Sequence, residues 1–555
     1  MADNRFISID QNSNPLWDPV PKLHALARQG WRGTHYVEDI DVAFTQRGVG
    51  PEHNEPTLAR EQYYRDGSSD WGTALFYADF LGRNMLDVHQ VAGYAGYKTS
   101  TLAKKLNYRD VDALFDAYSP GDTLQLVGPS YMSNAADTHR TIGDLCLAET
   151  QEYVFRLLEH ARENLLERFP EEEPRARIDE WFSNQRTWLH KLLQNRGSME
   201  RLVELYKDWM EAETSDAVDV RYSSELFSFT PERLADEPGF SLFKQFLRDY
   251  DRMADLHNEA VHATDTAVKP LDTSAGELPF FVVRRRESRQ LRTSLYLSGN
   301  KLSTGDGQEW TLGRNGAVPA AELQAAGVNA VAGKALVLVL QARCMKQGGG
   351  ALCMPYKGSQ YMNVAHRFEA NLRKAEFLPD TIPPIMRVRF NVFDHWRRCS
   401  TIIRLPSYLS GAFSADELPA WRFAEEYPAV LKRAQDELAR LTDDTSRQVF
   451  MHELFADKYR KREFLRERQR TLAEDPQTRP QAGEVWKQIK AIDEQLLDSL
   501  VKRIVQNIHI TGLEHWNSRG AVYPWSIALG GQQFYEHILQ QAEIYPERPG
   551  ESQTA

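Results

Sequence analysis

Hydrophobic residues recur every three or four positions over much of this chain. The spacing is helical from 149 to about 206, in Phe240–His262, and from 417 to about 510, and it predicts amphipathic helices in these stretches. In the last stretch, which is broken near Asp475, the spacing suits an antiparallel helical hairpin or a short coiled coil. We therefore expect long helices on both sides of the middle third of the chain.

The middle third changes to short apolar runs bounded by turn residues. The runs are Glu277–Val283, Leu291–Leu297, Ala335–Leu340, Met386–Phe393 and Thr401–Leu405. The first two predict a β-hairpin, and the third, which is the longest apolar stretch, predicts a buried strand. This part of the chain is expected to be α/β.

The N-terminal part has a less regular pattern. Proline, glycine and polar residues interrupt residues 1 to about 70, and they predict an irregular, surface-wrapping entry segment before a helical stretch. Thr123–Val127 is a short apolar run that leads through Gly128 into a long helical sequence. A strand, a turn and a helix in this order open a Rossmann-like unit, although a GxGxxG motif is absent.

These changes of pattern divide the chain into five segments. They are an irregular and helical segment (1–118), a strand-turn-helix unit with a helical insertion (119–270), an α/β core with a glycine-rich loop (271–416), a helical hairpin or coiled coil (417–512) and a C-terminal segment (513–555). The predicted fold class is α/β with large helical content, built as a Rossmann-like core with inserted helical segments and a C-terminal antiparallel hairpin.

Composition narrows the function classes. The net charge is −11, from 67 basic and 78 acidic residues, which argues against a general coat of nucleic acid or anionic lipid and favours a small-molecule partner. The basic cluster from Lys458 to Arg470 could contact nucleic acid, but the exposed face of a charge-balanced helix explains it better. Four cysteines without a CxxC pair, no signal peptide and no long apolar run predict a cytoplasmic protein away from the membrane.

The glycine-rich turn from Lys346 to Gly358 is the first candidate site. Its candidate anion-binding residues are Arg343, Lys346, Gly348, Gly349, Gly350, Tyr356, Lys357 and Ser359. Consecutive glycines let backbone N–H groups approach an anion, and the neighbouring cations add charge. The GxxxxGK[ST] pattern of a phosphate-binding loop is absent. A tight connection that needs positive φ explains the glycines equally well.

The turn from Gly128 to Arg140 is the second candidate. Its polar residues are Ser130, Tyr131, Ser133, Asn134, Asp137, His139 and Arg140. At a strand-to-helix turn, free N–H groups and the helix dipole favour an anion. Helix capping by Ser133 or Asn134 is the alternative.

Isolated acid–base groups and thiols complete the candidates. His257, His262, His395 and His515 lack the spacing of a metal site, and histidines beside aromatic residues are usually packed or surface residues. Cys344 and Cys353 flank the glycine turn, and either could be a nucleophile if a nearby cation stabilised its thiolate. Buried, inert cysteines are the more common case.

Several short strings, taken in order, resemble a known family. They are the helix Asp251–Ala260, the strand entry Glu277–Phe281, the run Lys334–Leu340 followed by Gly348-Gly349, and the late helical hairpin, with Leu126–Pro129 at the family's first glycine-containing turn. Over residues 120–540 the chain resembles the BshC-like ligases, whose named member adds cysteine in bacillithiol biosynthesis.

The resemblance implies a function. It implies a carbon–nitrogen bond-forming ligase acting on an amino-acid-like or sugar-acid substrate, and it makes a nucleotide such as ATP or ADP the candidate cofactor. It also implies a Rossmann-like core and a coiled-coil hairpin that mediates a homodimer. In this interpretation Gly128–Asn134 and Gly348–Gly358 line one cleft.

The resemblance also assigns roles to single residues. His139 or Asp137 would be the acid–base group, and Arg343, Lys346 and Lys357 would hold a carboxylate or phosphate. The alternative from another class is a non-catalytic binding or scaffold protein that assembles through the helical hairpin. The seam residues Ile489, Ile492 and Leu496 are the predicted contacts of that assembly.

Overall fold

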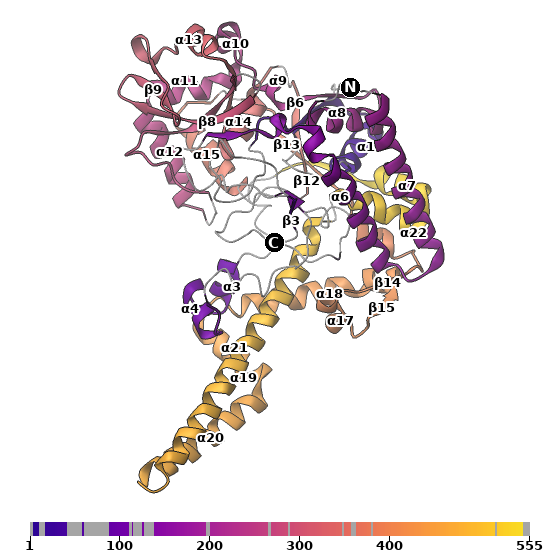
Figure 1. Ribbon diagram of the computed structural model, residues 1–555, viewed down its shortest axis with the longest axis vertical. Helices are drawn as coiled ribbons and strands as arrows, with labels where there is room; N and C mark the ends of the chain where they lie inside the picture. Colours follow the sequence, from indigo (N-terminus) through magenta and orange to yellow (C-terminus); the bar gives the residue numbers. More distant parts are fainter. Residues whose placement is uncertain are drawn as a thin grey trace.

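The computed structural model describes most of the chain. The described residues are 4–9, 17–41, 58–59, 81, 88–109, 114, 125–126, 138–195, 200–264, 268–286, 289–346, 349–356, 362–378, 381–516 and 519–547. They form a mixed α/β structure with a large share of helix (Figure 1). Of the helices in these ranges, none combines the length and the apolar character that crossing a bilayer would need.

A six-stranded sheet lies at the centre of the fold. Its strands, in spatial order, are β6 (Val218–Tyr222), β2 (Arg32–Val37), β1 (Arg5–Ile9), β12 (Ala351–Pro355), β13 (Ile385–Arg389) and β16 (Glu543–Pro546). The first five are parallel, and β16 is antiparallel to β13. The sheet therefore joins strands from both ends of the chain.

Both faces of this sheet are buried at its centre, and successive residues of β1 and of β12 face different cores. Phe6 of β1 packs in one core, and its neighbour Ile7 packs in the other. Cys353 and Leu352 of β12 are divided in the same way. Side chains alternate across a strand, so a strand buried on both faces is apolar throughout.

One core is formed with helices from the N- and C-terminal parts of the chain. They are α1 (Val20–Arg28), α6 (Leu147–Arg168), α7 (Glu172–Asn195), α8 (Leu202–Glu213), α16 (Val392–Trp396), α17 (Ser407–Phe413), α18 (Ala420–Ala439) and α22 (Val522–Gln541), with α3 (Val88–Tyr94) and α4 (Thr99–Lys105) further out. The short pair β14 (Ile402–Arg404) and β15 (Glu417–Pro419) lies beside α17, and β14 confirms the strand predicted at Thr401–Leu405.

The other core joins the central sheet to a second, antiparallel sheet. Its strands are β10 (Glu309–Thr311), β9 (Lys301–Thr304), β8 (Arg289–Ser298), β7 (Glu277–Arg286) and β11 (Val328–Gly333), and β5 (Thr138–Arg140) also pairs with β8. The predicted hairpin is thus confirmed as β7 and β8. The helices of this lobe are α9 (Ser223–Leu226), α10 (Pro231–Asp236), α11 (Ser241–Arg248), α12 (Tyr250–His262), α13 (Ala320–Ala325), α14 (Leu336–Cys344) and α15 (Met362–Lys374).

The predicted strand at Ala335–Leu340 is wrong, because this run is helix α14. The helix is buried against β11, β12 and α15, so apolar residues occur on all of its sides. Such a helix lacks a polar stripe, and a short apolar run of this kind cannot be told from a buried strand by its periodicity. The strand that follows the glycine-rich turn is β12.

The predicted irregular entry segment is also wrong over its first part. The described residues 5–9 and 17–37 include β1, α1 and β2, and β1 lies in the middle of the central sheet. Thr123–Val127, predicted to open a Rossmann-like unit, contains the two-residue strand β4 (Gln125–Leu126), which pairs with β3 (Leu58–Ala59) in a separate sheet. A buried parallel strand such as β1 needs only five residues, and a hydrophobic pattern of that length is too short to recognise in the sequence.

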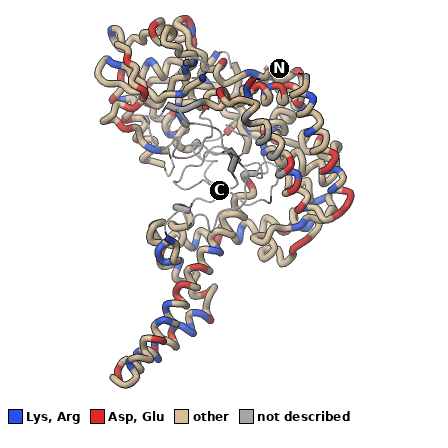
Figure 2. Tube along the Cα trace, in the orientation of Figure 1, with Lys and Arg blue, Asp and Glu red and all other residues tan. Residues whose placement is uncertain are grey.

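Three helices carry the chain away from the body and back. They are α19 (Asp444–Leu454), α20 (Ala456–Glu474) and α21 (Arg479–Trp516), and α20 packs along α21 (Figure 1). We call α20 and the facing part of α21 the arm. Lysine, arginine, aspartate and glutamate are mixed along it (Figure 2), and Arg460, Arg466 and Arg470 each pair with an acidic residue three positions earlier. The basic cluster is therefore balanced within its own helix.

Candidate functional site

The carboxyl ends of the five parallel strands lie along one edge of the central sheet, because parallel strands all end on the same side. The described residues that follow them include Glu38 after β2, Ser223 after β6 and Tyr356 after β12, and Arg389 is the last residue of β13. In open α/β sheets, ligands bind outside the carboxyl ends of the strands. We call this side the carboxyl edge.

Two buried carboxyl groups share one serine hydroxyl at the carboxyl edge. Ser223 Oγ lies 2.8 Å from Glu38 Oε1 and 2.8 Å from Asp39 Oδ1. The N–H of Asp39 donates to Ser223 Oγ at 3.1 Å, and the N–H of Ser224 donates to Asp39 Oδ1 at 2.7 Å. These contacts join the end of β2 to the start of α9, and all four groups come from the turns that follow two neighbouring strands.

Hydrogen bonds and burial act together on these carboxyl groups. A hydroxyl has one hydrogen to donate, so Ser223 donates to only one of its two carboxyl neighbours, and Glu38 Oε1 also accepts the backbone N–H groups of Ile40 at 2.9 Å and Asp41 at 3.0 Å. Burial, followed by the nearby Asp41 and Asp39 charges, raises the pKa of Glu38 to about 8. Burial also raises the pKa of Asp39. The raised pKa of Glu38 favours its protonated form near neutral pH, and we call Glu38, Asp39 and Ser223 the carboxyl cluster.

The second sheet closes over the carboxyl cluster. Gln290 of β8 donates its side-chain N–H to the carbonyl oxygen of Asp39 at 3.2 Å, and its backbone N–H to Asp144 Oδ1 at 2.8 Å. Arg292 forms an ion pair with Asp41 and lies over the Phe281 ring at 3.7 Å. The backbone of the cluster is thus held by the second sheet as well as by the central one.

A cation lies further along the same edge. The Arg389 guanidinium lies 4.5 Å from the centre of the Tyr356 ring, and its nearest carboxylate, Glu514, is 3.9 Å away. The Arg389 side chain is 34% exposed, and its buried Nε has no hydrogen-bond partner among the described residues. A loosely paired guanidinium with an open donor is suited to a carboxylate or phosphate.

The carboxyl cluster and Arg389 are separated along the edge by three strand spacings, or roughly 14 Å. A substrate that spans this distance could place an anionic group on Arg389 and its reacting end beside Glu38. A protonated carboxyl with a pKa near neutral can transfer a proton in both directions. Within the ranges that the structure describes, three or more metal-ligating side chains do not come together.

The part of the glycine-rich turn that precedes β12 lies at the opposite edge of the sheet, whereas the predicted residue Tyr356 follows β12 and lies at the carboxyl edge. The first part joins α14 to β12, so Gly349 and Gly350 precede the strand, at its amino end. A Cβ on Gly350 would lie 2.5 Å from the backbone of Arg5, and Gly349 has a φ of +52°. Close approach to β1 and a positive φ explain these two glycines, in agreement with the alternative of a tight connection.

The cations predicted beside this turn have partners within the chain. Arg343 is buried, with its Nη1 2.6 Å from Glu369 and its Nε donating to the carbonyl oxygen of Pro383 at 2.7 Å. Lys346 donates from Nζ to the carbonyl oxygen of Asp236 at 2.9 Å. Arg343 and Lys346 thus bind a carboxylate and backbone carbonyl groups of this chain. The sequence predicted that these two side chains hold a ligand.

The second predicted turn is only partly described. The residues of this turn that lie outside the described residues are Gly128, Ser130, Tyr131, Ser133, Asn134 and Asp137. The same holds for three residues of the first turn, Gly348, Lys357 and Ser359. His139 and Arg140 are on β5, opposite Arg292 and Leu291 of β8, so their predicted place in the first turn of a helix is wrong. The backbone N–H of Gly143 donates to the Asp39 carbonyl oxygen at 2.9 Å, which brings this segment beside the carboxyl cluster.

Three of the isolated candidates, His257, Cys344 and Cys353, behave as packed residues. His257 is buried against Phe368, and burial lowers its pKa to about 4. Burial raises the pKa of Cys344 to about 11 and that of Cys353 to about 12. Both shifts disfavour the thiolate, which agrees with the interpretation of these cysteines as inert.

The sequence reasoning missed Glu38, Asp39, Ser223 and Arg389. One signal was present, because the acidic residues Glu38, Asp39 and Asp41 directly follow the apolar Tyr36-Val37. An apolar run that ends in carboxylates is typical of a strand that delivers side chains to a site. Searches of this chain against family models, curated proteins and solved structures return no match.

Proposed function

We propose that this protein is a small-molecule enzyme whose reaction takes place at the carboxyl edge, between the carboxyl cluster and Arg389. The observation that carries the proposal is a proton-bearing buried carboxyl at the carboxyl end of a parallel strand, on the same edge as an open guanidinium. The reaction class that we propose, carbon–nitrogen bond formation on an amino-acid-like or sugar-acid substrate, comes from the resemblance to the BshC-like ligases.

The strand order supports the Rossmann-like part of the proposal. Numbered along the chain, the parallel strands run 3-2-1-4-5, with β1 and β12 in the middle. The helix between β1 and β2, α1, packs in one core, and the helix between β12 and β13, α15, packs in the other. A sheet built outward in two directions has a switch point where ligands bind. In this fold the switch point is between β1 and β12.

The proposed chemistry assigns a role to each side chain. When an amine forms a bond to carbon, a proton leaves the nitrogen and a leaving oxygen gains one. Glu38 would deliver or receive that proton, with Asp39 and Ser223 as its relay. Arg389 would hold the carboxylate or phosphate of the substrate. The nucleotide that the resemblance implies, ATP or ADP, would bind at the same edge.

The test begins with a thermal-shift screen of the whole chain against nucleotides, amino acids and sugar acids, because a specific ligand raises the melting temperature by mass action. We expect Arg389→Gln to weaken the best ligand by about 10- to 100-fold, the loss typical of a charged hydrogen bond. Glu38→Gln should leave binding intact and abolish turnover, since an amide keeps the hydrogen bonds without a titratable proton. Glu484→Gln, on the exposed arm, is the control for both variants.

Two results would count against the proposal. One is an Arg389→Gln variant that binds the best ligand as well as the wild type does. The other is a Glu38→Gln variant that keeps full turnover of a substrate identified by the screen.

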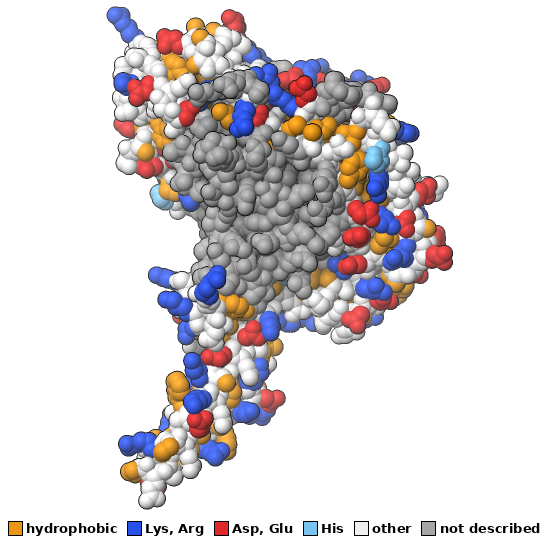
Figure 3. Space-filling model, in the orientation of Figure 1, with side chains coloured by type: hydrophobic (Ala, Val, Ile, Leu, Met, Phe, Trp, Pro, Cys, Tyr) orange, Lys and Arg blue, Asp and Glu red, His pale blue; other side chains and the backbone are white. Residues whose placement is uncertain are grey.

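The alternative function, assembly through the arm, is favoured by a different observation. Phe464 on α20 is 67% exposed and Trp486 on α21 is 53% exposed, and hydrophobic side chains appear among the charged ones on the arm (Figure 3). The seam residues Ile489, Ile492 and Leu496 are buried within the chain itself. Replacing them would unfold the arm, so they are the wrong residues with which to test assembly.

Exposed aromatic residues give a cleaner test of the alternative. If copies of this chain associate through the arm, Trp486→Lys with Phe464→Lys should reduce the mass measured by light scattering to that of one chain. Trp421→Lys, at another exposed tryptophan on α18, serves as the control. An unchanged mass in the double variant would remove the arm as the contact.

A further inference from the structure

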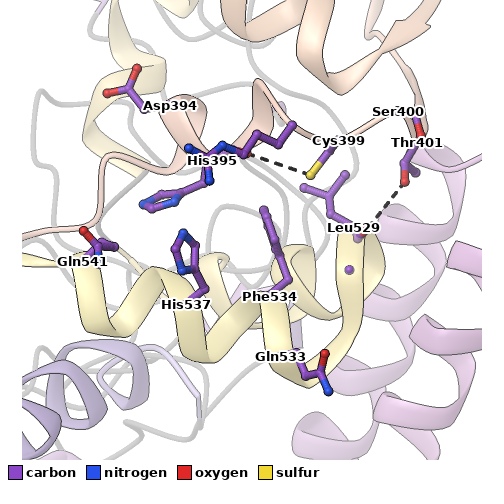
Figure 4. Close-up of a pocket in the computed structure, with 12 residues that line it drawn as sticks. Asp394, His395, Cys399, Ser400, Thr401, Leu529, Gln533, Phe534, His537 and Gln541 are labelled. Atoms are coloured by element: carbon purple, nitrogen blue, oxygen red, sulfur yellow. Dashed lines mark hydrogen bonds between the residues drawn. The ribbon is translucent and has the colours of Figure 1, made fainter.

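A cavity outside the carboxyl edge has the features of a second binding site. It has a volume of about 730 Å³ and lies between the segment Asp394–Thr401 and the second half of α22. That volume is within the range of sites for small molecules. Figure 4 shows His395 on one wall and His537 and Phe534 on the other, with the His537 ring directed toward His395. None of these residues takes part in the proposed reaction.

The two imidazole rings are the central feature of the cavity. The ring centres of His395 and His537 are 5.2 Å apart, and the planes are perpendicular. Burial, followed by the charge of His537, lowers the pKa of His395. The His537 charge therefore discourages a proton on His395. An anion placed between the two rings would act in the opposite direction, because an opposite charge favours the protonated form of His395.

Arg398 adds a permanent positive charge to the same cavity. Among the described residues no carboxylate pairs with its guanidinium, and the nearest acidic neighbour in sequence, Asp394, pairs instead with Arg397 at 3.4 Å. Phe534 and Leu529 supply an apolar wall. One guanidinium, two imidazoles and an apolar wall match a molecule that carries an oxyanion on a carbon skeleton.

We infer that this cavity binds a small organic molecule through a carboxylate or phosphate group held by Arg398, His395 and His537, with its carbon skeleton against Phe534. The site is distinct from the carboxyl edge and stands whether or not the proposed reaction is correct. The charged groups that act on His395 are His537 from α22, and Asp394 and Arg398 from its own segment. Protonation of His395 adds a positive charge to the cavity, so the binding of an anion strengthens as the pH falls.

The test uses inorganic phosphate and succinate as probes of the whole chain. Its melting temperature is measured with each anion, and with sodium chloride at equal ionic strength, at about pH 6 and about pH 8, on either side of the histidine pKa. We expect one or both anions to stabilise the wild type more at the lower pH. Arg398→Gln and His537→Asn should each weaken this affinity by about tenfold or more.

A matched variant distinguishes binding in this cavity from an effect of the net charge of the chain. Arg468→Gln removes the same charge from the exposed arm, and it should respond to the anions as the wild type does. A response to phosphate alone identifies a phosphate site, and a response to succinate alone identifies a carboxylate site. Failure of both anions to stabilise the wild type beyond sodium chloride, or a full response in Arg398→Gln and His537→Asn, overturns the inference.

A second measurement needs no variant. Diethyl pyrocarbonate modifies accessible histidines, and mass spectrometry reports the modified peptides. The stabilising anion should protect the peptides that contain His395 and His537 and leave the exposed His452 reactive. Equal modification of all three histidines with and without the anion contradicts the inference, even if the substituted chains do not fold.

Discussion

The two edges of the central sheet use charged residues in opposite ways. At the amino edge, beside the glycine-rich turn, Arg343 is buried and held by Glu369 and by the Pro383 carbonyl. At the carboxyl edge, Glu38 keeps its proton and Arg389 is only loosely paired. The amino edge has the glycines and cations that are typical of an anion site. The carboxyl edge has a cation in a position to bind an anion. Strand direction, which composition does not record, makes this difference.

The largest expected effect tests whether Arg343 is structural. Arg343→Met should lower the free energy of unfolding by about 3 to 5 kcal/mol, because it leaves the mostly buried Glu369 with only the exposed Arg373 as a partner. Arg373→Met removes that other partner, at 2.9 Å, but Arg373 is 36% exposed and the loss should be below about 1 kcal/mol. Urea unfolding measures both. Equal losses would show that Arg343 is no more structural than an exposed arginine.

The next effect concerns the glycine turn itself. Gly350→Ala should cost about 1 to 3 kcal/mol, because the new methyl group meets the Arg5 backbone and forces β1 and β12 apart. Gly483→Ala is the control, since nothing lies within 4 Å of its Cβ position on α21. It should stabilise the chain by a few tenths of a kcal/mol to about 1 kcal/mol. If Gly350→Ala folded normally but lost ligand binding, the turn would be a site after all.

The last effect is a pH dependence at the carboxyl edge, which is spread over several pH units. The folded-state pKa of Glu38, about 8, exceeds its ordinary value of 4.5. The folded chain therefore holds a proton that the unfolded chain releases, and its stability falls as pH rises between these values, by up to about 1.4 kcal/mol per pH unit. Asp39, whose pKa is also raised, acts in the same direction.

Glu38→Gln provides the comparison for this pH dependence. The amide cannot titrate, so the stability of the variant should fall less steeply between about pH 5 and about pH 8, the window given by the Glu38 values. Urea unfolding at several pH values measures both slopes. Parallel slopes for the wild type and Glu38→Gln would show that Glu38 is charged in the folded chain.

Much of the local structure could be predicted from the sequence, while the site could not. The β7–β8 hairpin and the helix near Phe240–His262 follow from periodicity, although the latter divides into α11 and α12 at Asp249. Glu38 and Ser223 are 185 residues apart, and local pattern carries no information about a contact at that separation. Only the pairing of β2 with β6 brings them together.

The glycine-rich turn shows the same division between sequence and tertiary structure. By itself the sequence determined that the backbone near Gly349 needs unusual freedom, that no known phosphate-loop pattern is present, and that apolar residues surround the turn. Tertiary structure alone decided that the apolar run before it is helix α14, that the strand after it is β12, and that the turn lies at the amino edge. Periodicity reports which residues are buried, whereas the direction and order of strands depend on contacts between distant segments.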